Sequence, residues 1–176
     1  FKILPHSKCD ECALVRHEFM LTDEQLAEYY SKSYRSDYQW VNSGPTSKHI
    51  KKRISEAKTR LNKLQPFLKK NPKVLDFGCG SGEFIELLQD SGVMARGFEP
   101  GKLYSNYAKG EKGLDVQNCG WENYECKEKL DVVTAFHVFE HLTDPLKAFK
   151  KAVSWLNVGG LIYIEVPNMA NGLKLK

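Results

Sequence analysis

Hydrophobic residues between positions 48 and 70 recur at steps of three and four, the spacing that places them on one face of a helix. The recurring positions are Ile50, Ile54, Ala57, Leu61, Leu64 and Leu68. This pattern predicts a long amphipathic helix whose lysines and arginines lie on the opposite, solvated face. Pro66 is expected to kink or end the helix near its last turn, because proline lacks the backbone donor.

From position 73 the rhythm changes to short apolar runs that alternate with amphipathic stretches. Strands are predicted for residues 73–78, 94–100, 113–118, 130–137 and 161–168. Helices are predicted for residues 81–92, 102–110 and 144–156, with a further helical turn within 121–129. Gly159 and Gly160 are expected to mark the end of the last helix. Such alternation predicts an α/β fold: a Rossmann-like, doubly wound, mostly parallel sheet with helices on both faces.

The part before this sheet is predicted to be small and helical. Thr22 followed by Gln25 has the pattern of a capping box at a helix start. The expected organisation is a C-x-x-C segment at 1–20, a helical segment at 21–71, and the Rossmann-like domain at 72–176. The last domain is expected to be incomplete at its C-terminus, because its final apolar strand would otherwise be an exposed edge.

Composition narrows the classes of partner. Hydrophobic residues make up 41% and charged residues 27%, which is ordinary for a globular domain. No apolar run reaches the roughly 18 residues that cross a bilayer, and the charged N-terminal stretch does not resemble a signal peptide. The net charge of +4 is mild and comes without a nucleic-acid-binding motif. We therefore expect a cytoplasmic protein with neither nucleic acid nor membrane as partner; its oligomeric state is left open.

The five cysteines are an odd number and accompany no secretory signal, so disulfides are not expected. Cys9 and Cys12 form a C-x-x-C pair, which supplies two of the four ligands of a structural zinc site. The other half of such a ribbon is expected before Phe1. Zinc is therefore not expected to be held by this stretch of chain alone.

Candidate chemistry gathers at the first strand-to-helix turn, which reads VLDFGCGSGEF. Gly78, Gly80 and Gly82 allow a sharp bend and a close approach of backbone to ligand. A dinucleotide site favours G-x-G-x-x-G, whereas this loop is G-x-G-x-G and follows an acidic residue, Asp76. Glu99 ends the next strand, at a distance from the loop that suits a carboxylate bound to adenosine ribose hydroxyls.

The segments VLDFGCGSGEF, GFEP and FHVFEHLTDP together resemble class I S-adenosylmethionine-dependent methyltransferases. Within that superfamily they are similar to the small-molecule branch whose fourth strand ends in an E-H pair before Asp-Pro. The resemblance covers roughly residues 72–168. The C-x-x-C start is similar to bacterial and archaeal members with a zinc-ribbon-like front end, some of which act on nucleotide sugars or polyketide-type substrates.

The resemblance implies a set of residues around the cofactor S-adenosylmethionine. Its members would hold the methionyl end, the ribose and the adenine in turn; they are Asp76, Gly78, Cys79, Gly80, Gly82, Glu99, Pro100, Gly120, Trp121, Phe136 and His137. Cys119 would lie beside the adenine with Gly120 and Trp121. The family pattern also has seven strands, of which this chain includes five.

The segment HVFEH, residues 137–141, allows two readings. As H-x-x-E-H it matches zinc peptidases that carry both histidines on one helix, but the preceding strand and the helix start at Asp144-Pro145 disfavour that reading. As part of a methyltransferase it would face the reacting methyl group. His141 is then our first candidate for a general base or substrate orienter, with His137 second. Glu140 would fix the loop, or bind a divalent metal with His141; alternatively the E-H pair only caps the following helix.

The predicted function is S-adenosylmethionine-dependent methyl transfer to a small-molecule acceptor, such as a sugar nucleotide or another secondary metabolite. Two alternatives stay open: a methyltransferase-like domain that binds the cofactor without catalysis, and an NAD-dependent oxidoreductase. Whether oxygen, nitrogen or carbon accepts the methyl group is not predicted.

Overall fold

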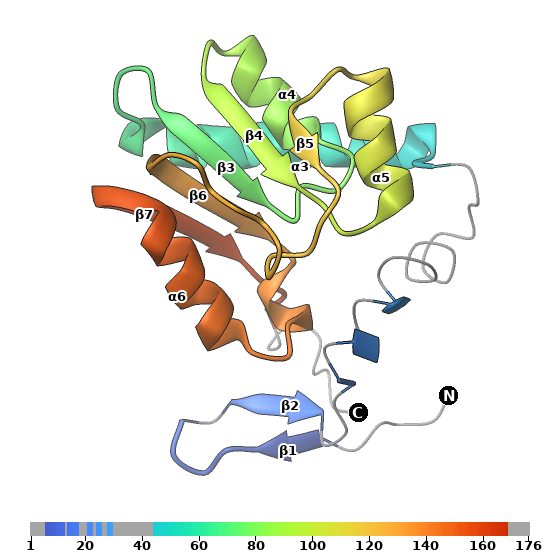
Figure 1. The fold of residues 1–176 in the computed structure, drawn as a ribbon, viewed down its shortest axis with the longest axis vertical. Coiled ribbons are helices and arrows are strands. Elements are labelled where there is room, and N and C mark those ends of the chain that lie inside the picture. The colour runs from blue at the N-terminus through green and yellow to red at the C-terminus, as the bar shows by residue number, and fades with distance from the viewer. Residues whose placement is uncertain are drawn as a thin grey trace.

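The protein is built around a five-stranded parallel sheet (Figure 1). The computed structural model describes residues 6–12, 14–17, 21, 22, 24, 25, 28, 29 and 44–168. Within these the sheet consists of β3 (Lys73–Phe77), β4 (Met94–Phe98), β5 (Val116–Gln117), β6 (Leu130–Phe136) and β7 (Leu156–Glu165). Their spatial order is β5-β4-β3-β6-β7, so the order reverses between β3 and β6. The α/β, Rossmann-like fold predicted from the alternating pattern is confirmed.

Helices cover both faces of the sheet. Their bounds are α3 (Ser47–Leu64), α4 (Glu83–Asp90), α5 (Lys102–Asn106) and α6 (Pro145–Trp155), with short helical turns at η1 (Gln65–Phe67), η2 (Tyr107–Glu111) and η3 (Phe139–His141). Alternate strand residues point to opposite faces. Thus Val74 packs with α3 and α4 in one core layer, while Leu75 packs with α6 in the other. In Figure 1, α6 lies in front of the sheet and α3 and α4 lie behind it.

The long helix α3 forms where the apolar stripe predicts it. Thr46 caps its start by accepting a hydrogen bond from the backbone N–H of His49. The helix ends at Leu64, and Pro66 falls within η1, as expected for a residue that cannot continue the ladder. The prediction that all basic side chains of this helix are solvated is wrong. Arg60 is only 6% exposed, because it shares the inward face with Ala57 and Leu64.

The C-terminal half differs from expectation at two points. Asp144 caps α6 and Pro145 begins it, as predicted. However, the chain passes directly from Trp155 into β7, so Gly159 and Gly160 lie within the strand instead of closing the helix. There β7 shifts its register against β6, and Gly159 takes a φ of +74°. The helical turn predicted within 121–129 is also wrong, since residues 121–123 form only a turn and the rest of this stretch is neither helix nor strand.

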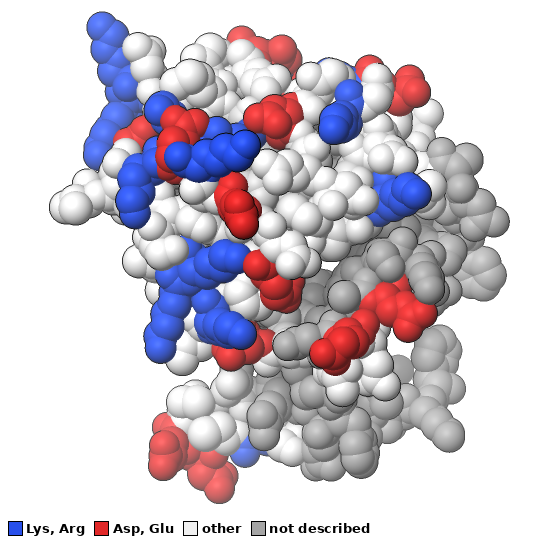
Figure 2. Space-filling model, in the orientation of Figure 1, with Lys and Arg blue, Asp and Glu red and all other residues white. Residues whose placement is uncertain are grey.

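Near the N-terminus, β1 (His6–Lys8) and β2 (Val15–His17) form an antiparallel hairpin. Thr22 and Gln25 exchange the two reciprocal hydrogen bonds of the predicted capping box. Most of the helix predicted to follow lies outside the described residues. Within the described part of the chain, every helix is too short or too polar to span a bilayer. Figure 2 shows positive and negative side chains interspersed over the described part of one face.

Candidate functional site

The glycine loop lies beyond the carboxyl end of β3, next to the point where the strand order reverses. Ligands of doubly wound sheets bind at this place. Gly78, Gly80 and Gly82 all have positive φ values, of +71°, +57° and +83°. A Cβ atom at Gly78 would lie 2.7 Å from Val138 Cγ2, and one at Gly82 would lie 2.5 Å from Leu114 Cδ1. Both conformation and space therefore require glycine at these two positions.

Glu99, at the end of β4, ties this loop to its neighbour. Its Oε2 accepts a hydrogen bond from the N–H of Gly80 and its Oε1 accepts one from the N–H of Gly101, both at 2.9 Å. The side chain amide of Asn118 donates to the carbonyl oxygens of Glu99 and Pro100, at 2.9 and 3.1 Å. Asn118 was not singled out from the sequence, although it follows β5 as Glu99 follows β4.

Asp76 is a buried carboxylate at the floor of the site. It is 3% exposed, and its Oδ1 accepts a hydrogen bond from the Thr134 hydroxyl at 2.7 Å. Burial raises the pKa of Asp76 to about 7, and the nearby Glu99 adds to the rise. The Thr134 hydrogen bond and the positive charges of Arg60 and Arg53 oppose that rise. Asp76 is therefore a carboxyl group whose charge depends on pH near neutrality.

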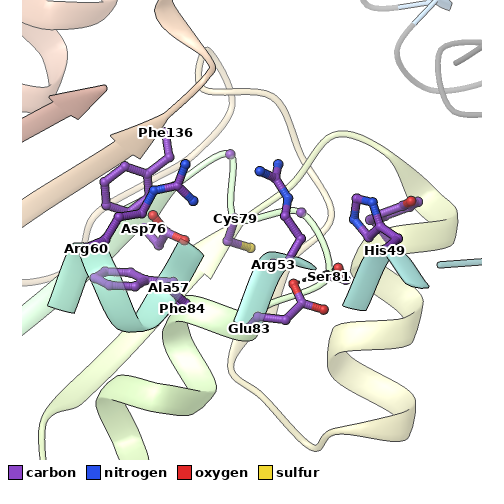
Figure 3. Close-up of a pocket in the computed structure, with 13 residues that line it drawn as sticks. His49, Arg53, Ala57, Arg60, Asp76, Cys79, Ser81, Glu83, Phe84 and Phe136 are labelled. Atoms are coloured by element: carbon purple, nitrogen blue, oxygen red, sulfur yellow. Dashed lines mark hydrogen bonds between the residues drawn. The ribbon is translucent and has the colours of Figure 1, made fainter. Parts of the chain in front are cut away.

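Helix α3 covers this floor with side chains that the sequence analysis did not assign to the site. Figure 3 shows Arg53 and Arg60 projecting from α3 toward the region of Asp76 and Cys79. Thirteen residues line the pocket between helix and loop: His49, Arg53, Ala57, Arg60, Asp76, Gly78, Cys79, Gly80, Ser81, Glu83, Phe84, Tyr104 and Phe136. The missed signal was spacing, since Arg53 and Arg60 are three or four residues from buried Ala57 and so share its face.

A second buried carboxylate, Glu83, begins α4 beside the loop. Its Oε2 accepts a hydrogen bond from the Ser81 hydroxyl at 2.7 Å, while Oε1 is buried and has no hydrogen-bond partner among the described residues. Lys112 Nζ lies 3.6 Å from Oε1 and closer, at 2.6 Å, to Glu86. Oε1 can therefore accept a hydrogen bond from a donor group of a ligand in the pocket.

The aromatic wall of the pocket comes from the predicted Phe136 and its neighbours. Phe136 contacts Phe84 and Tyr163 edge to face, with ring centroids 4.9 and 5.2 Å apart. The Arg60 guanidinium carbon lies 4.4 Å from the Phe136 ring centroid. At the other end, His49 and Tyr104 meet edge to face at 5.5 Å.

The HVFEH segment is a strand-to-helix connection, so the peptidase reading is wrong. His137 follows β6 with a φ of +57°, and η3 includes only residues 139–141. His137 and His141 therefore do not share a helix. Glu140 Oε1 lies 3.4 Å from His137 Nδ1 and 3.8 Å from His141 Nε2. No cluster of three or more metal-ligating side chains is found among the described residues.

Other predicted site residues lie at varying distances from this pocket. Cys79 lines it, and burial, with the nearby Asp76 and Glu99 carboxylates, raises the pKa of its thiol. Trp121 packs in the core layer under α6 and does not line the pocket; the half-buried Gly120 precedes it. Cys9 and Cys12 are exposed in the turn of the β1–β2 hairpin. Their role as half of a zinc site stays a prediction.

Comparison with known proteins gives one family. A family model described as a methyltransferase domain matches residues 49–174. The tRNA U34 carboxymethyltransferase of Campylobacter hominis is 29% identical over 116 residues, covering 60% of this chain and 40% of that protein. The ubiquinone biosynthesis O-methyltransferase of Haemophilus ducreyi is 31% identical over 108 residues, covering 54% of this chain and 45% of that protein. The chain thus spans less than half the length of these relatives.

Solved structures share the fold. The plantazolicin methyltransferase BpumL, in complex with a pentazolic desmethylPZN analog and SAH, aligns with a TM-score of 0.61 at 21% identity, over 86% of this chain and 62% of that one. A SAM-dependent methyltransferase from Archaeoglobus fulgidus aligns with a TM-score of 0.58 at 28% identity, over 65% of this chain and 53% of that one. The domain match, the strand order and the glycine loop agree, and the chain belongs to the class I S-adenosylmethionine-dependent methyltransferases.

Proposed function

We propose that this chain forms the cofactor-binding part of an enzyme that transfers the methyl group of S-adenosylmethionine to a small molecule. One observation carries the proposal. Beyond the carboxyl end of β3 the glycine loop lies beneath α3, with Asp76 and Glu83 on the loop side and Arg53 and Arg60 on the helix side. Anionic and cationic groups thus face each other across one pocket. An amino acid headgroup with both charges fits between them.

The roles of the residues follow from their charges. Arg53 would hold the carboxylate of the methionyl moiety, because its guanidinium projects from α3 toward the loop (Figure 3). Asp76, with the backbone of Gly78 and Gly80, would hold the ammonium end. Glu99 already accepts two backbone hydrogen bonds, and a carboxylate accepts up to about four, so ribose hydroxyls can share it.

Two features of the pocket agree with such a ligand. The buried Glu83 Oε1 lacks a hydrogen-bond partner among the described residues, as expected where a donor group of a ligand belongs. The positive φ values of Gly78, Gly80 and Gly82 bend the loop sharply, and Gly78 and Gly80 line the pocket with their backbone. A dinucleotide pyrophosphate suits this place less well, since it would meet two buried carboxylates.

The bound cofactor supplies an electrophilic methyl group on a sulfonium. The chain's part is to align an acceptor with that group, exclude water and remove the acceptor's proton. Phe136 and Phe84 provide an apolar wall next to Asp76. The HVFEH segment lies at the carboxyl end of β6. It includes two histidines, either of which could remove the acceptor's proton. A hydroxyl group is the acceptor class we favour, because the ubiquinone relative is named as an O-methyltransferase.

Binding and turnover can be tested in sequence. Calorimetric titration should detect S-adenosylhomocysteine binding and no binding of NAD. Methyl-labelled S-adenosylmethionine should then transfer label to members of a panel of phenols and sugars. NAD binding without S-adenosylhomocysteine binding would overturn the proposal. Binding without transfer to any acceptor would instead favour a cofactor-binding domain that is not catalytic.

A further inference from the structure

A chain of charged side chains leads from α3 to the ends of β6 and β7. Arg60 donates from Nε and Nη2 to the same oxygen, Glu165 Oε1, at 3.1 and 2.5 Å. These hydrogen bonds lower the pKa of Glu165, and so does the charge of Arg60. Arg60 is buried and rests on Phe136, which limits where its guanidinium can move. Glu165 is therefore an anion held in one place by a fixed cation.

The same Glu165 oxygen reaches His137. Glu165 Oε1 lies 3.3 Å from His137 Nε2. The other ring nitrogen, Nδ1, lies 3.4 Å from Glu140 Oε1. The backbone also joins these residues, since the N–H of His137 donates to the carbonyl of Glu165 at 2.8 Å.

His137 has a left-handed backbone conformation, which is uncommon for residues other than glycine. Its φ is +57°, and residues other than glycine with such a φ cluster at functional sites. The conformation directs the chain away from β6 directly after Phe136. His137 is about one third exposed, so its ring is accessible from solvent.

We propose that Glu165, fixed by Arg60, positions His137 as the base that removes the acceptor's proton. The inference rests on the proposed methyl transfer. In the step, an acceptor oxygen forms a bond to the methyl carbon, the carbon–sulfur bond breaks, and its electron pair stays on sulfur. The acceptor's proton passes to Nδ1 of His137, where the acceptor hydroxyl takes the place of Glu140 Oε1, while Nε2–H stays directed at Glu165. Glu165 and Arg60 touch no reacting atom and are positioning residues.

This arrangement selects His137 over His141, the candidate preferred from sequence. His141 Nε2 lies 3.8 Å from Glu140 Oε1. Among the ion pairs of the described residues, Arg60 pairs with Glu165 and not with Glu140, so His141 is the member of this series of contacts that is farthest along from Arg60. A carboxylate that is itself fixed and contacts one imidazole nitrogen selects the tautomer whose other nitrogen can accept a proton. His137 contacts such a carboxylate, Glu165, which Arg60 holds through two hydrogen bonds.

The kinetic test is Glu165→Gln, which keeps the size of the side chain and removes its charge. With the best acceptor of the panel, kcat should fall at least about tenfold, while KM for the acceptor and the S-adenosylhomocysteine Kd change less than about twofold. His137→Gln should lose about a hundredfold or more in kcat. Glu128→Gln is the matched control, because Glu128 also pairs with two cations, Lys73 and Arg96, at the opposite end of the sheet. It should keep the wild-type kcat.

A spectroscopic test requires no acceptor. In protein with ¹⁵N-labelled histidine, correlation spectra show which ring nitrogen carries the proton, and His137→Gln assigns the signal. The wild type should hold the Nε2–H tautomer when the ring is neutral, and Glu165→Gln should give a mixture. An unchanged tautomer, or an active Glu165→Gln enzyme with wild-type kcat, overturns the inference. Failure of the proposed function would look different: the wild type would bind no S-adenosylhomocysteine.

Discussion

The Thr134 hydroxyl donates a hydrogen bond to Asp76 across the boundary between β6 and β3, with 2.7 Å between the two oxygens. This boundary is where the strand order reverses. Both side chains are nearly inaccessible to water. The one hydroxyl donor does not offset the loss of hydration, so burial dominates and the carboxyl group prefers its protonated form up to a pH of about 7.

The ligand-free protein should therefore lose stability as the pH rises toward neutrality. Asp76 has a folded-state pKa of about 7 against an ordinary value of 3.8. A group with a raised pKa contributes its full stabilisation when the pH is below its ordinary pKa. This stabilisation is lost as the pH rises through the folded-state pKa. Urea denaturation should show a decline of about 3–4 kcal/mol between these limits. Asp76→Asn should flatten the decline; an equal decline in the variant would contradict the assignment.

Ligand binding should change the favoured form of Asp76 from the protonated carboxyl group to the carboxylate. An ammonium group beside it favours the carboxylate, so binding of S-adenosylhomocysteine below pH 7 should release a proton and strengthen as the pH rises. Calorimetry in two buffers of different ionisation enthalpy measures that proton directly. The charged groups that act on Asp76 are Arg60, Arg53 and Glu99, and none of them is altered in the control, Asp90→Asn, on the far end of α4. If Asp76→Asn released the same number of protons on binding as the wild type, a group other than Asp76 would be their source.

Glu99→Gln should weaken both the fold and the cofactor site. The wild-type carboxylate accepts hydrogen bonds from the N–H groups of Gly80 and Gly101. A glutamine amide has one acceptor and one donor end, so one of these buried N–H groups would face another donor. The free energy of unfolding should fall by about 1–3 kcal/mol, and S-adenosylhomocysteine should bind at least about tenfold more weakly. Glu125→Gln, at an exposed position, serves as control.

The fold and the floor of the site could be predicted because both depend on local sequence. Alternating apolar runs fix the parallel sheet, and the spacing of Gly78, Gly80 and Gly82 places the bend before a helix. Glu99 could be predicted because it ends the next strand. These features need no knowledge of what packs on them.

The cover of the site could not be predicted in the same way. Arg53 and Arg60 are charged residues of the kind expected on a solvated helix face. They line the pocket because α3 packs over the glycine loop. The contact between Arg60 and Glu165 joins residues 105 positions apart. Nor does the sequence indicate the positive φ of His137, which depends on how β6 ends against β7.

Gly97 should be sensitive to the smallest enlargement. A Cβ atom there would lie 2.8 Å from the Asp76 carbonyl oxygen and 2.9 Å from Cys79 Cβ, so the clash involves the backbone of β3 itself. Gly97→Ala should lower the free energy of unfolding by about 1–3 kcal/mol and reduce S-adenosylhomocysteine affinity through the displaced loop. In Gly110→Ala the added methyl group meets no atom within 4 Å. Chemical denaturation of the two variants should show a large loss only for Gly97→Ala.

Arg53→Met should separate the two halves of the cofactor. If Arg53 holds the carboxylate of the methionyl moiety, its loss removes a charge-assisted hydrogen bond of about 1.5–3 kcal/mol. Binding of S-adenosylhomocysteine should then weaken at least about tenfold. Binding of methylthioadenosine, which has the same nucleoside and thioether but no amino acid, should change less than about twofold. Calorimetric titration of both ligands measures the contrast.

The control for this comparison is Lys58→Met, a cation on the exposed side of the same helix. It alters the net charge of α3 as Arg53→Met does but lies away from the glycine loop, so both ligands should bind as in the wild type. Equal weakening of both ligands by Arg53→Met would mean that the arginine orders the pocket instead of contacting the carboxylate. An unchanged affinity for both would leave Arg60 as the remaining cation in that wall of the pocket.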